Sequence, residues 1–595
     1  MALAHLLAFL MTTHTNISVT DFGAKPNSRD DTTASIARAI ASLPPAGGTV
    51  EFPTGEYHFY RENAFDRELW LSNTEVANPR RISILLEGLK GVRLKGNGSK
   101  LVFHDRVIPF AILNSKNISI DGFTVDWGRP LMSQGTVLAS GRDGFTLKID
   151  RKLYPYVVED GALYFTDRTW KRKPWAFMEF DPRTKGVAYN TGDQGFTDGD
   201  VSSARVSELL PDKVRFDFAC KRYPRVGDVL VARHGVRDHA GTFILGSKNV
   251  TLSHVNYRHT SGLGVLSQYS ADLKFQYVEV AEDPKSTRMF AGHDDGFHFS
   301  NCRGDILVDR CRFEGLMDDP INVHGTAVKV IERLGSHSLR CRFMHNQSVG
   351  LMFGTVGDVV SFIDHETMLS RGVGNLTGVN HLSAEEIEVT FKEGVPEGVK
   401  VGDALEDLTW TPNFTVRHTE FGCVRARGLL ISTPGKVVVE DCLFRSSGAA
   451  ILIAGDANYW YESGAVTDVT VRRNRFVDCN TSPYQFGDAV ISIHPEIPTM
   501  GSRPFHRGIK IEGNLFQTFD APLLWAKSTG DLTFRNNEIQ ATLAFPPRSA
   551  NAPGLTFIGC ENVQVAGNRL DPKFLGRLTR IDGGKPETVS IEGWR

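Results

Sequence analysis

The sequence lacks the features that mark several large classes of protein. Its 67 basic and 69 acidic residues leave a net charge of −2, and no basic stripe of the kind that binds nucleic acid is present. No GxSxG, GxxxxGK or HExxH motif occurs, so nothing indicates an α/β-hydrolase nucleophile, a P-loop or a zincin. The eight cysteines form no CxxC pair. Because Cys311 and Cys442 fall at apolar positions of predicted strands, we expect buried free thiols rather than disulfides or metal ligands.

The N-terminal segment MALAHLLAFLMTT lacks a basic n-region, and its apolar run is too short to span a bilayer. Two interpretations of residues 1–15 stay open, the remnant of an export leader and a frayed tail. We expect no membrane span. The near-zero net charge also argues against a strongly acidic polymer as ligand. The sequence indicates no oligomeric state.

What the sequence does contain is a repeat of the form apolar-x-apolar-x-x-small/polar-x-apolar. Several copies are 23 residues apart, as are Val250 and Leu273. The clearest copies begin at Ile118, Val250, Leu273, Ile306, Phe414, Val437, Val469, Ile509, Leu532 and Val563. Strands stacked in parallel, one repeat per coil, bury the alternating residues as continuous ladders. The pattern therefore predicts an elongated all-β coil rather than one compact core.

An asparagine recurs between the two strands of the later repeats, as Asn474, Asn514, Asn537 and Asn568. A row of asparagines suggests either ligand binding or a structural role. At a fixed place between two strands, we expect each asparagine to bend the coil in the left-handed conformation and to hydrogen-bond to the coils above and below.

The first residues predict a cap on the stack. Ile17 and Val19 alternate as in a strand, and Asp31 or Thr32 is placed to cap a helix over residues 34–40. A helix at this point covers the first open strand edge. Asp21-Phe22-Gly23-Ala24, followed by Asp30-Asp31-Thr32, resembles the opening of right-handed parallel β-helix proteins of the pectin-degrading type, which implies that fold for the coil.

Two stretches lose the repeat and show short alternating strands with glycine turns instead. The segments at 225–230 and 400–405 correspond to each other, so we predict two related antiparallel modules, each a barrel or a sandwich. The predicted organisation is 1–15 leader or frayed tail, 16–130 N-terminal coils with the capping helix, 131–240 first module, 241–325 coils with the acidic motifs, 326–411 second module, and 412–595 C-terminal coils.

Two acidic pairs, Asp294-Asp295 and Asp318-Asp319, flank one predicted strand. Asp295 and Asp318 are 23 residues apart, which predicts that they lie on adjacent rungs about 4.8 Å apart. Carboxylates that close do not all ionise at neutral pH without cost, and one raised pKa is what acid-base catalysis needs. An Asp-Asp before glycine or proline is also ordinary turn chemistry. Two pairs in register favour a catalytic site over two turns.

Three histidines, His293, His298 and His324, accompany the pairs. Their spacing matches no standard metal-binding set. We therefore expect them to contact substrate or to orient the aspartates, and we predict neither a metal nor another cofactor.

The motifs HDDGFHF and GLMDDPINVHG, with the β-helix opening and the two inserted modules, resemble glycoside hydrolase family 110. These bacterial exo-acting enzymes remove terminal α-1,3-linked galactose from blood group B type structures. The resemblance extends from Asp21 to the last coil. It implies inverting hydrolysis, with Asp318 as general acid and Asp295 and Asp319 as the pair that activates water. It also implies a periplasmic or secreted protein.

Further substrate contacts follow from the chemistry of sugars, which offer apolar ring faces to aromatics and hydroxyls to polar groups. Two tryptophans are candidate platforms, although each is equally suited to packing over a coil edge. The candidate contacts are Asp294, His298, Asn322, His324, Trp410, Arg425, Arg427, Trp460 and Glu462. The expected partner is a galactose-terminated glycan, either fucose-branched or linear.

Two other functions are compatible with a β-helix. A calcium-dependent polysaccharide lyase would use the four aspartates as ligands and Arg288 as base, but the chain lacks a basic cluster for an acidic polymer. A non-catalytic glycan-binding β-helix needs no close carboxylates. The sequence favours the hydrolase over both.

Overall fold

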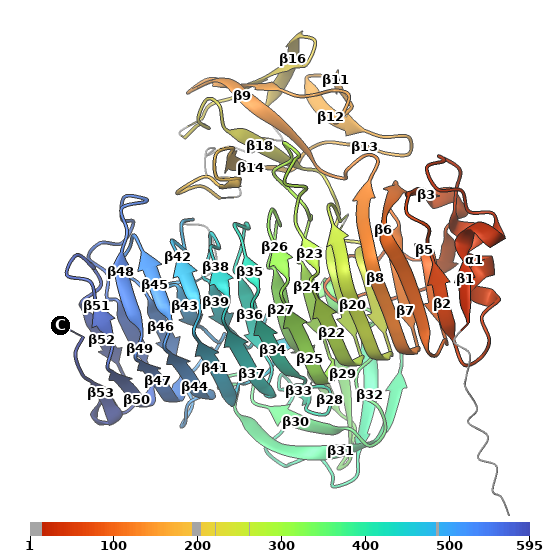
Figure 1. Cartoon of the computed structure of the whole chain (residues 1–595). Helices are drawn as coiled ribbons and strands as arrows, with labels where there is room; N and C mark the ends of the chain where they lie inside the picture. Colours follow the sequence, from red (N-terminus) through yellow and green to blue (C-terminus); the bar gives the residue numbers. More distant parts are fainter. Residues whose placement is uncertain are drawn as a thin grey trace, which may run out of the picture.

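The computed structural model describes residues 15–192, 201, 204–220, 222–260, 262–482 and 487–594. The leader predicted for residues 1–15 lies outside them except for Thr15. Figure 1 shows one long stack of parallel coils, with an antiparallel module above it and another below it. The predicted fold class, an all-β parallel β-helix with two inserted antiparallel modules, is confirmed. No helix in the described ranges is long and apolar enough to cross a membrane.

Sheet A is the larger of the two sheets that form the coils, and within the described residues it has 23 strands. The repeat copies predicted from sequence lie in register, as Leu273 opposite Ile306 and Phe414 opposite Val437 show. Its strands are β1 (Asn16–Ser18), β2 (Gly48–Glu51), β3 (Glu56–Tyr60), β6 (Val92–His104), β8 (Lys116–Trp127), β20 (Lys248–Tyr257), β22 (Ala271–Gln276), β23 (Glu279–Val280), β25 (Arg303–Asp309), β26 (Arg312–Phe313), β34 (Asn413–Arg417), β35 (Glu420–Phe421), β37 (Lys436–Glu440), β38 (Leu443–Phe444), β41 (Asp468–Arg472), β42 (Arg475–Val477), β44 (His506–Glu512), β45 (Leu515–Thr518), β47 (Thr529–Arg535), β48 (Glu538–Ala541), β50 (Glu561–Ala566), β51 (Arg569–Leu570) and β53 (Val589–Ile591).

Sheet B closes the coils on the other side, and the sequence repeat did not reveal its strands. They are β4 (Phe65–Arg67), β5 (Arg80–Glu87), β7 (Ile108–Leu113), β19 (Ala240–Leu245), β21 (Leu263–Gln268), β24 (Phe297–Ser300), β27 (Ile321–Thr326), β36 (Leu429–Ser432), β39 (Ile451–Ile453), β43 (Ile491–Ile493), β46 (Leu524–Lys527), β49 (Leu555–Ile558) and β52 (Thr579–Asp582), with β40 (Glu462–Ser463) antiparallel to β27. Alternate residues face inward, as Phe297 and Phe299 do, while His298 between them faces outward toward the site.

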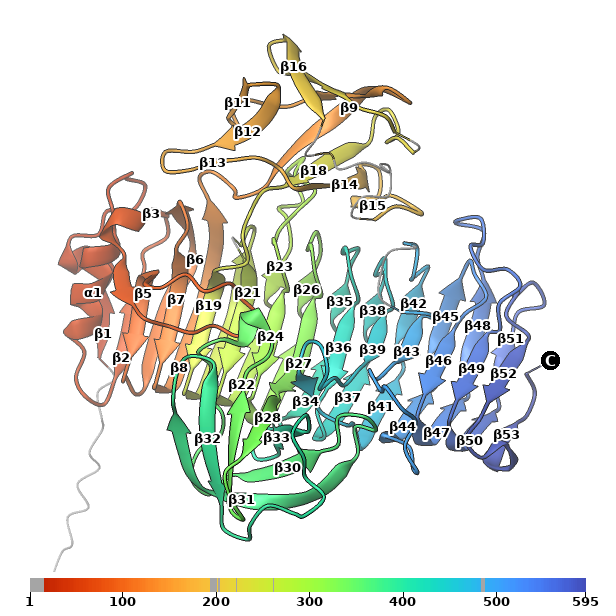
Figure 2. The ribbon, with the colours of Figure 1, turned by 180° about the vertical axis from the view of Figure 1, so that it is seen from behind.

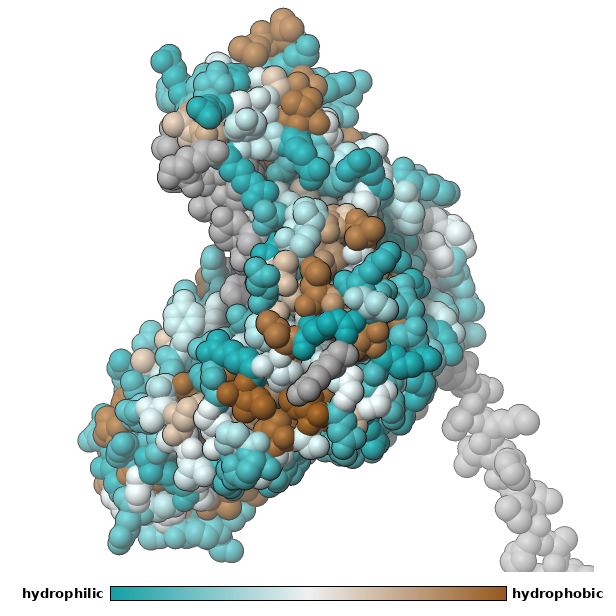
Figure 3. All heavy atoms as spheres, turned by 90° about the vertical axis from the view of Figure 1, so that its left-hand side faces the viewer, coloured by the Kyte–Doolittle hydropathy of each residue, from teal (hydrophilic) through white to brown (hydrophobic). Residues whose placement is uncertain are grey.

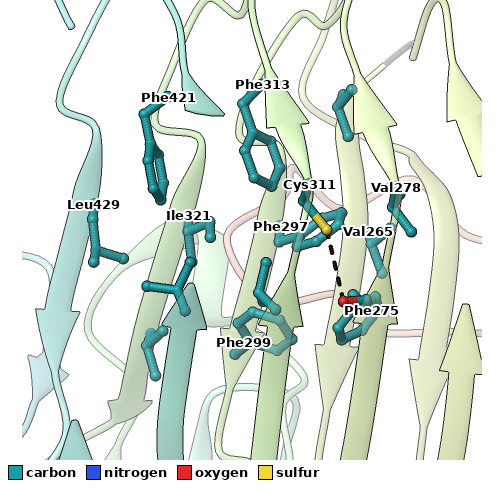
Figure 4. Close-up of a cluster of buried hydrophobic side chains, with 14 of the residues drawn as sticks. Val265, Phe275, Val278, Phe297, Phe299, Cys311, Phe313, Ile321, Phe421 and Leu429 are labelled. Carbon is teal, nitrogen blue, oxygen red and sulfur yellow. Dashed lines mark hydrogen bonds between the residues drawn. The ribbon is translucent and has the colours of Figure 1, made fainter. Parts of the chain in front are cut away.

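The core of the coil is a continuous ladder of apolar side chains (Figure 4). Phenylalanines from successive coils stack with ring centroids 4.3–5.8 Å apart, namely Phe313, Phe421, Phe444, Phe476, Phe516 and Phe534. Each such ring contributes about 1.5–3 kcal/mol by its burial. Cys311 lies in the same core, and the eight cysteines are all free thiols, as predicted. The rigid stack fixes the position of every outward-facing residue.

The asparagine ladder is confirmed as a structural feature. The side-chain oxygen of Asn514 accepts from the backbone N–H of Asn474, 2.9 Å away, and its amide donates to the carbonyl of Val471, 3.0 Å away. Asn537 and Asn568 repeat the pattern. The expectation of a left-handed asparagine is wrong, because the left-handed residue is the one before it, with φ of 56° at Arg473 and 54° at Asn536, for example.

The N-terminal cap is an α-helix, α1 (Thr33–Ala41), which covers the first coils (Figure 1). Thr32 occupies the N-cap position, and the Asp31 carboxylate accepts from the Thr33 N–H, 2.9 Å away. The predicted strand at Ile17 is shorter than expected, because the chain turns into the 3-10 helix η1 (Val19–Phe22). Three further 3-10 turns are described, η2 (Arg61–Asn63), η4 (Asn346–Ser348) and η5 (Pro586–Thr588).

Module 1 lies above the coils in Figures 1 and 2 and is an open antiparallel sheet beside a small one. In order across the larger sheet, its strands are β15 (Gly186–Val187), β14 (Ala176–Asp181), β18 (Val229–Arg233), β9 (Ser133–Gly141), β10 (Gly144–Lys148), β17 (Lys213–Asp217) and β16 (Arg205–Leu210). The small sheet contains β11 (Tyr156–Glu159), β12 (Ala162–Thr166) and β13 (Lys171–Arg172). The surface is hollowed below this module (Figure 3).

Module 2, below the coils, is a closed barrel. Around the barrel its strands are β28 (Val328–Arg333), β29 (Ser338–Arg342), β32 (Glu386–Phe391), β31 (Ser370–His381), β30 (Val359–Ile363) and β33 (Ala404–Asp407). Both modules contain the same turn where the sequence predicted a correspondence. Gly227 and Gly402 have φ of 94° and 104°, and their N–H groups donate to Val137 and Val330.

Candidate active site

The four aspartates lie on consecutive coils at the start of β24 and β27. The rung offset here is 24 residues, because Phe297 pairs with Ile321 and the Gly296 N–H donates to the Asp319 carbonyl at 2.9 Å. The expected pairing of Asp295 with Asp318, based on an offset of 23, is therefore wrong by one residue. Asp295 lies opposite Asp319, and the same offset of 24 residues places Asp294 opposite Asp318.

The next rung carries Arg427, which is an ion-pair partner of Asp319. Its guanidinium Nη2 contacts Asp319 Oδ2, and its backbone N–H donates to Oδ1 at 2.8 Å. Module 2 is inserted between these two rungs, so neighbours in the stack are 108 residues apart in the chain. Both oxygens of Asp319 accept hydrogen bonds, and its side chain is almost completely buried.

Arg237 joins the two coils from the segment that returns from module 1. Its Nη1 donates to Asp318 Oδ2 at 2.8 Å and its Nη2 donates to Asp295 Oδ1 at 3.1 Å. Asp294 Oδ1 is 3.9 Å from the same guanidinium and 3.0 Å from His293 Nδ1. The Asp318 side chain is 19% exposed, against 2% for Asp295. Asp318 is therefore the carboxylate that is open to a ligand.

The aspartates open into a cavity of about 600 Å³. Its wall combines the carboxylates and arginines with two tryptophans and with sheet B residues of later coils. The lining residues are Asn73, Trp175, Arg233, Arg237, Asp295, Asp318, Asp319, Asn322, Arg425, Arg427, Leu430, Ser432, Leu452, Ala454, Gly455, Asp456, Trp460, Glu462, Gly487, Asp488, His494 and Glu496. The size suits one or two sugar rings.

On one side of the cavity, hydrogen-bonding side chains surround Glu462. Its carboxylate accepts from the amides of Asn73 at 2.5 Å and Asn322 at 3.3 Å. Burial raises the pKa of Glu462, but His324, His298 and these amides outweigh burial and lower the pKa below its usual value. Glu462 is thus a fixed acceptor for ligand hydroxyls.

The charges of the cluster shift the pKa values of the three central aspartates apart. Burial raises the pKa of Asp295 to about 8. The Arg237 charge acts in the opposite direction, and the negative charge of Asp318 adds to the effect of burial. Burial raises the pKa of Asp319 to about 8, against the opposing charge of Arg427. Burial also acts on Asp318, but Arg237, Arg425 and Arg427 outweigh it and hold its pKa well below the usual range. The cluster therefore retains a proton at neutral pH.

The chain is similar to a group of bacterial enzymes over almost its entire length. Alpha-1,3-galactosidase B of Bacteroides thetaiotaomicron is 42% identical over 583 residues, which cover 97% of this chain and 94% of the relative. Alpha-1,3-galactosidase A of Bacteroides fragilis is 36% identical over 564 residues, covering 93% and 91%. The chain belongs to glycoside hydrolase family 110. Two family models match the modules, GLAA-B beta-barrel domain I at residues 133–230 and domain II at 338–405.

Likeness to solved structures is lower. The mannuronan C-5 epimerase AlgE4 A-module of Azotobacter vinelandii aligns with 97% of this chain and 100% of its own, at 12% identity and a TM-score of 0.40.

The residues predicted from sequence fall into three groups in this family 110 protein. The catalytic candidates Asp295, Asp318 and Asp319 line the cavity, as do Asn322, Arg425, Arg427, Trp460 and Glu462. Asp294, His298 and His324 are buried behind the wall, where they contact other side chains of the site. Trp410 lies elsewhere, with its indole N–H on Asp358 at 3.1 Å and the Arg303 guanidinium 4.2 Å from its ring. The structure therefore does not support Trp410 as a substrate contact.

The prediction missed the residues that the modules and the first coils bring to the site. Arg237 and Arg233 come from the return of module 1, Trp175 precedes β14, and Asn73 lies in a loop before β5. None belongs to the repeat, so periodicity gives no signal for them. The cluster of arginine and histidine in RHGVRDH, residues 233–239, which leads from module 1 back into the coils at β19, was a sequence cue to these residues.

Arg288, the base that a lyase would need, contacts Asp126 at 3.0 Å and does not line the cavity. In the part of the chain that the structure describes, one group has metal-ligand geometry, Asp364, His365 and Asp403 in module 2. Arg371 already contacts both of those aspartates, at 2.6 and 2.9 Å. The cavity itself is built from carboxylates paired with guanidinium groups, as in a site for a neutral, hydroxyl-rich ligand.

Proposed function

We propose that the protein is an exo-acting, inverting glycoside hydrolase that releases terminal α-1,3-linked galactose from blood group B type glycans and from linear α-1,3-galactosyl glycans. The observation that carries the proposal is the set of three carboxylates on two adjacent rungs, in a cavity of sugar size. The name alpha-1,3-galactosidase shared by relatives that cover nearly the whole chain supports the substrate.

Asp318 is the proposed general acid. Its Oδ2 is held by Arg237, while its Oδ1 is 3.9 Å from Arg425 and the side chain is the most exposed of the three catalytic aspartates. An acid must reach the glycosidic oxygen within hydrogen-bond distance. Asp318 suits this role better than Asp295 or Asp319, because its side chain is 19% exposed, against 2% and 1% for theirs.

Asp295 and Asp319 are the proposed pair that binds and activates the water. They lie opposite each other on adjacent rungs, which suits two carboxylates that accept the two hydrogens of one water molecule. Attack by this water on the face opposite the leaving group inverts the anomeric centre, so an α-galactoside yields β-galactose.

The charges around the three aspartates favour the reverse distribution of the proton, because the pKa is lowered at Asp318 and raised at Asp295 and Asp319. The proposed roles require that the cluster's proton move to Asp318 when the glycan enters. Arg237 contacts both aspartates and lowers the pKa of each, so a shift of its guanidinium from Asp318 toward Asp295 would raise the pKa of Asp318 and lower that of Asp295.

The proposed galactose site is the side of the cavity around Glu462. Asn73, Asn322 and Glu462 offer donors and an acceptor for hydroxyls. Trp460, which is 41% exposed and packs with its ring centroid 4.3 Å from that of His345, offers a face for the apolar side of the sugar. The loop that carries Asn73 crosses this side, which fits a terminal residue rather than an internal one.

The test is proton NMR of the anomeric region during digestion of galactose-α-1,3-galactose and of the fucosylated B trisaccharide. Early β-galactose supports inverting hydrolysis, whereas early α-galactose contradicts it. Release from one substrate alone shows whether the fucose branch is required. Asp318→Asn should abolish release from both glycans.

The acid assignment has a separate test. A substrate whose leaving group needs no protonation, such as α-galactosyl fluoride, bypasses a missing acid but not a missing base. Asp318→Asn should therefore retain activity on the fluoride, while Asp319→Asn should lose it on both. The opposite pattern would exchange the two roles. Dialysis against a chelator should leave activity unchanged; a loss, with an ultraviolet-absorbing product, would favour the calcium-dependent lyase.

A further inference from the structure

Trp175 is an exposed aromatic on the wall of the cavity, and nothing in the catalytic scheme uses it. It comes from module 1, directly before β14, and 46% of its surface is exposed. Its backbone N–H donates to the carbonyl of Arg233 at 2.9 Å, and the Arg233 guanidinium lies 4.2 Å from the ring centroid. Arg233 is itself buried in β18. The ring is therefore fixed by backbone and side chain although it faces the cavity.

A tryptophan held in one orientation on a cavity wall presents its exposed ring to a ligand. A buried arginine on one face orients the indole through a cation-π contact and leaves the rest of the ring for another partner. In a cavity rich in carboxylates, the partner that suits an aromatic face is the apolar face of a pyranose ring.

Trp175 and the proposed galactose site lie at opposite ends of one chain of contacts. The Trp175 ring is next to His293, with centroids 6.5 Å apart, and His293 is bonded to Asp294. Asp294 is 3.9 Å from Arg237. Arg237 Nε donates to the Asn73 carbonyl at 2.6 Å, and the Asn73 amide donates to Glu462. Arg237, a middle link of this chain, also holds Asp318, the proposed acid.

We propose that Trp175 is the platform for the sugar that carries the terminal galactose, the leaving group of the reaction. This inference rests on the proposed function. A general acid protonates the oxygen between the two sugars, so it lies between their binding sites. With galactose on the Glu462 side of Asp318, the leaving sugar falls on the Trp175 side. Module 1 thereby contacts the sugar that differs between linear and fucose-branched substrates.

The test compares two substrates that differ in this sugar. Galactose-α-1,3-galactose places a ring on Trp175, whereas α-galactosyl fluoride has none. Trp175→Ala should lower kcat/KM for the disaccharide about 10-fold or more, chiefly through KM, and leave the fluoride within about twofold; a stacked base or ring is worth about this much in other proteins. Trp460→Ala should lower both, because it removes a contact to galactose itself.

Tyr223→Ala is the matched control, since Tyr223 is also 46% exposed and also in the module 1 region but does not line the cavity. It should change neither substrate. Trp175→Phe, which keeps a ring, should recover part of the disaccharide activity. Equal losses on both substrates, or no loss on the disaccharide, would overturn the platform. Failure of the parent enzyme to hydrolyse either substrate would instead overturn the proposed function.

A binding measurement separates the platform from effects on the chemical step. In the Asp318→Asn background the disaccharide is bound without turnover. Adding Trp175→Ala should weaken binding of the disaccharide by the same factor as the change in KM and leave binding of free galactose unchanged. Weaker binding of both would place Trp175 in the galactose site and contradict the proposal.

Discussion

The Nε2 atoms of His298 and His324 lie 2.7 Å apart in the interior behind the active site. His324 Nδ1 donates to the Gly325 carbonyl at 2.8 Å, so in a neutral ring its Nε2 is the acceptor and His298 Nε2 the donor. A neutral His298 then has no proton on Nδ1, which is 2.6 Å from Asp295 Oδ2. One further proton must lie between Asp295 and His298. The geometry thus reaches the same conclusion as the raised pKa of Asp295.

His324→Leu removes the acceptor of this chain, and His324→Gln keeps one. With leucine, His298 can carry its single proton on Nδ1 and donate to an ionised Asp295, so the pKa of Asp295 should fall. Because the proposed mechanism passes this proton to Asp318, its loss from the cluster sets the alkaline limb of the kcat/KM profile. We expect that limb to move at least one pH unit lower in His324→Leu and much less in His324→Gln. Equal shifts in both variants would contradict the shared proton. His506→Leu, at a buried histidine away from the cavity, is the control.

Asp295→Asn should change the pH dependence of stability in a definite direction. Asp295 has a pKa of about 8 in the folded protein against 3.8 for an ordinary aspartate, so the folded state holds more protons than the unfolded state between these values. Its contribution is therefore full below about pH 4 and is lost as the pH rises to about 8. Asparagine does not titrate. The melting temperature of the variant should rise relative to the parent across this window, by the equivalent of at most about 1.4 kcal/mol per pH unit.

Arg237→Gln should change the pH dependence of stability in the opposite direction. The guanidinium lowers the pKa of both Asp295 and Asp318, so its removal raises both and the folded variant binds more protons. Its stability should therefore fall more steeply than that of the parent as the pH rises from 4 to 8. A melting-temperature difference independent of pH would show that Arg237 acts by packing alone. Arg237→Lys, which keeps the charge but not the fork, should restore the pH dependence.

Asn514→Ala should weaken the stack locally. The change leaves the Asn474 N–H and the Val471 carbonyl without partners in the interior, each at a cost of about 1–3 kcal/mol. Amide hydrogen exchange in β41 and β44 should accelerate by the corresponding factor, while exchange in module 2 should not change. Lys510→Ala, on the exposed side of β44, is the matched control. Uniform acceleration through the chain would contradict a local effect.

The coil could be predicted from sequence because a repeated burial pattern forces equivalent residues into one ladder, as with Val437 and Val469. The register at the acidic pairs could not be predicted, since the number of residues at the corners varies from coil to coil. One additional residue places Asp295 opposite Asp319 instead of Asp318. Arg237 and Trp175 were out of reach for another reason. They come from an insert, and which side chains of an insert meet a groove depends on its docking, which leaves no period in the sequence.

The ion pair between Asp319 and Arg427 spans the whole of module 2. Because the two residues belong to neighbouring rungs, the insert can gain, lose or exchange segments without altering their separation. The same arrangement sets an order of events during synthesis, since the ribosome must complete the barrel before Arg427, the partner of Asp319, exists. A protein of this design can diversify what it recognises through its inserts while the spacing of its reactive groups is inherited unchanged from the stack.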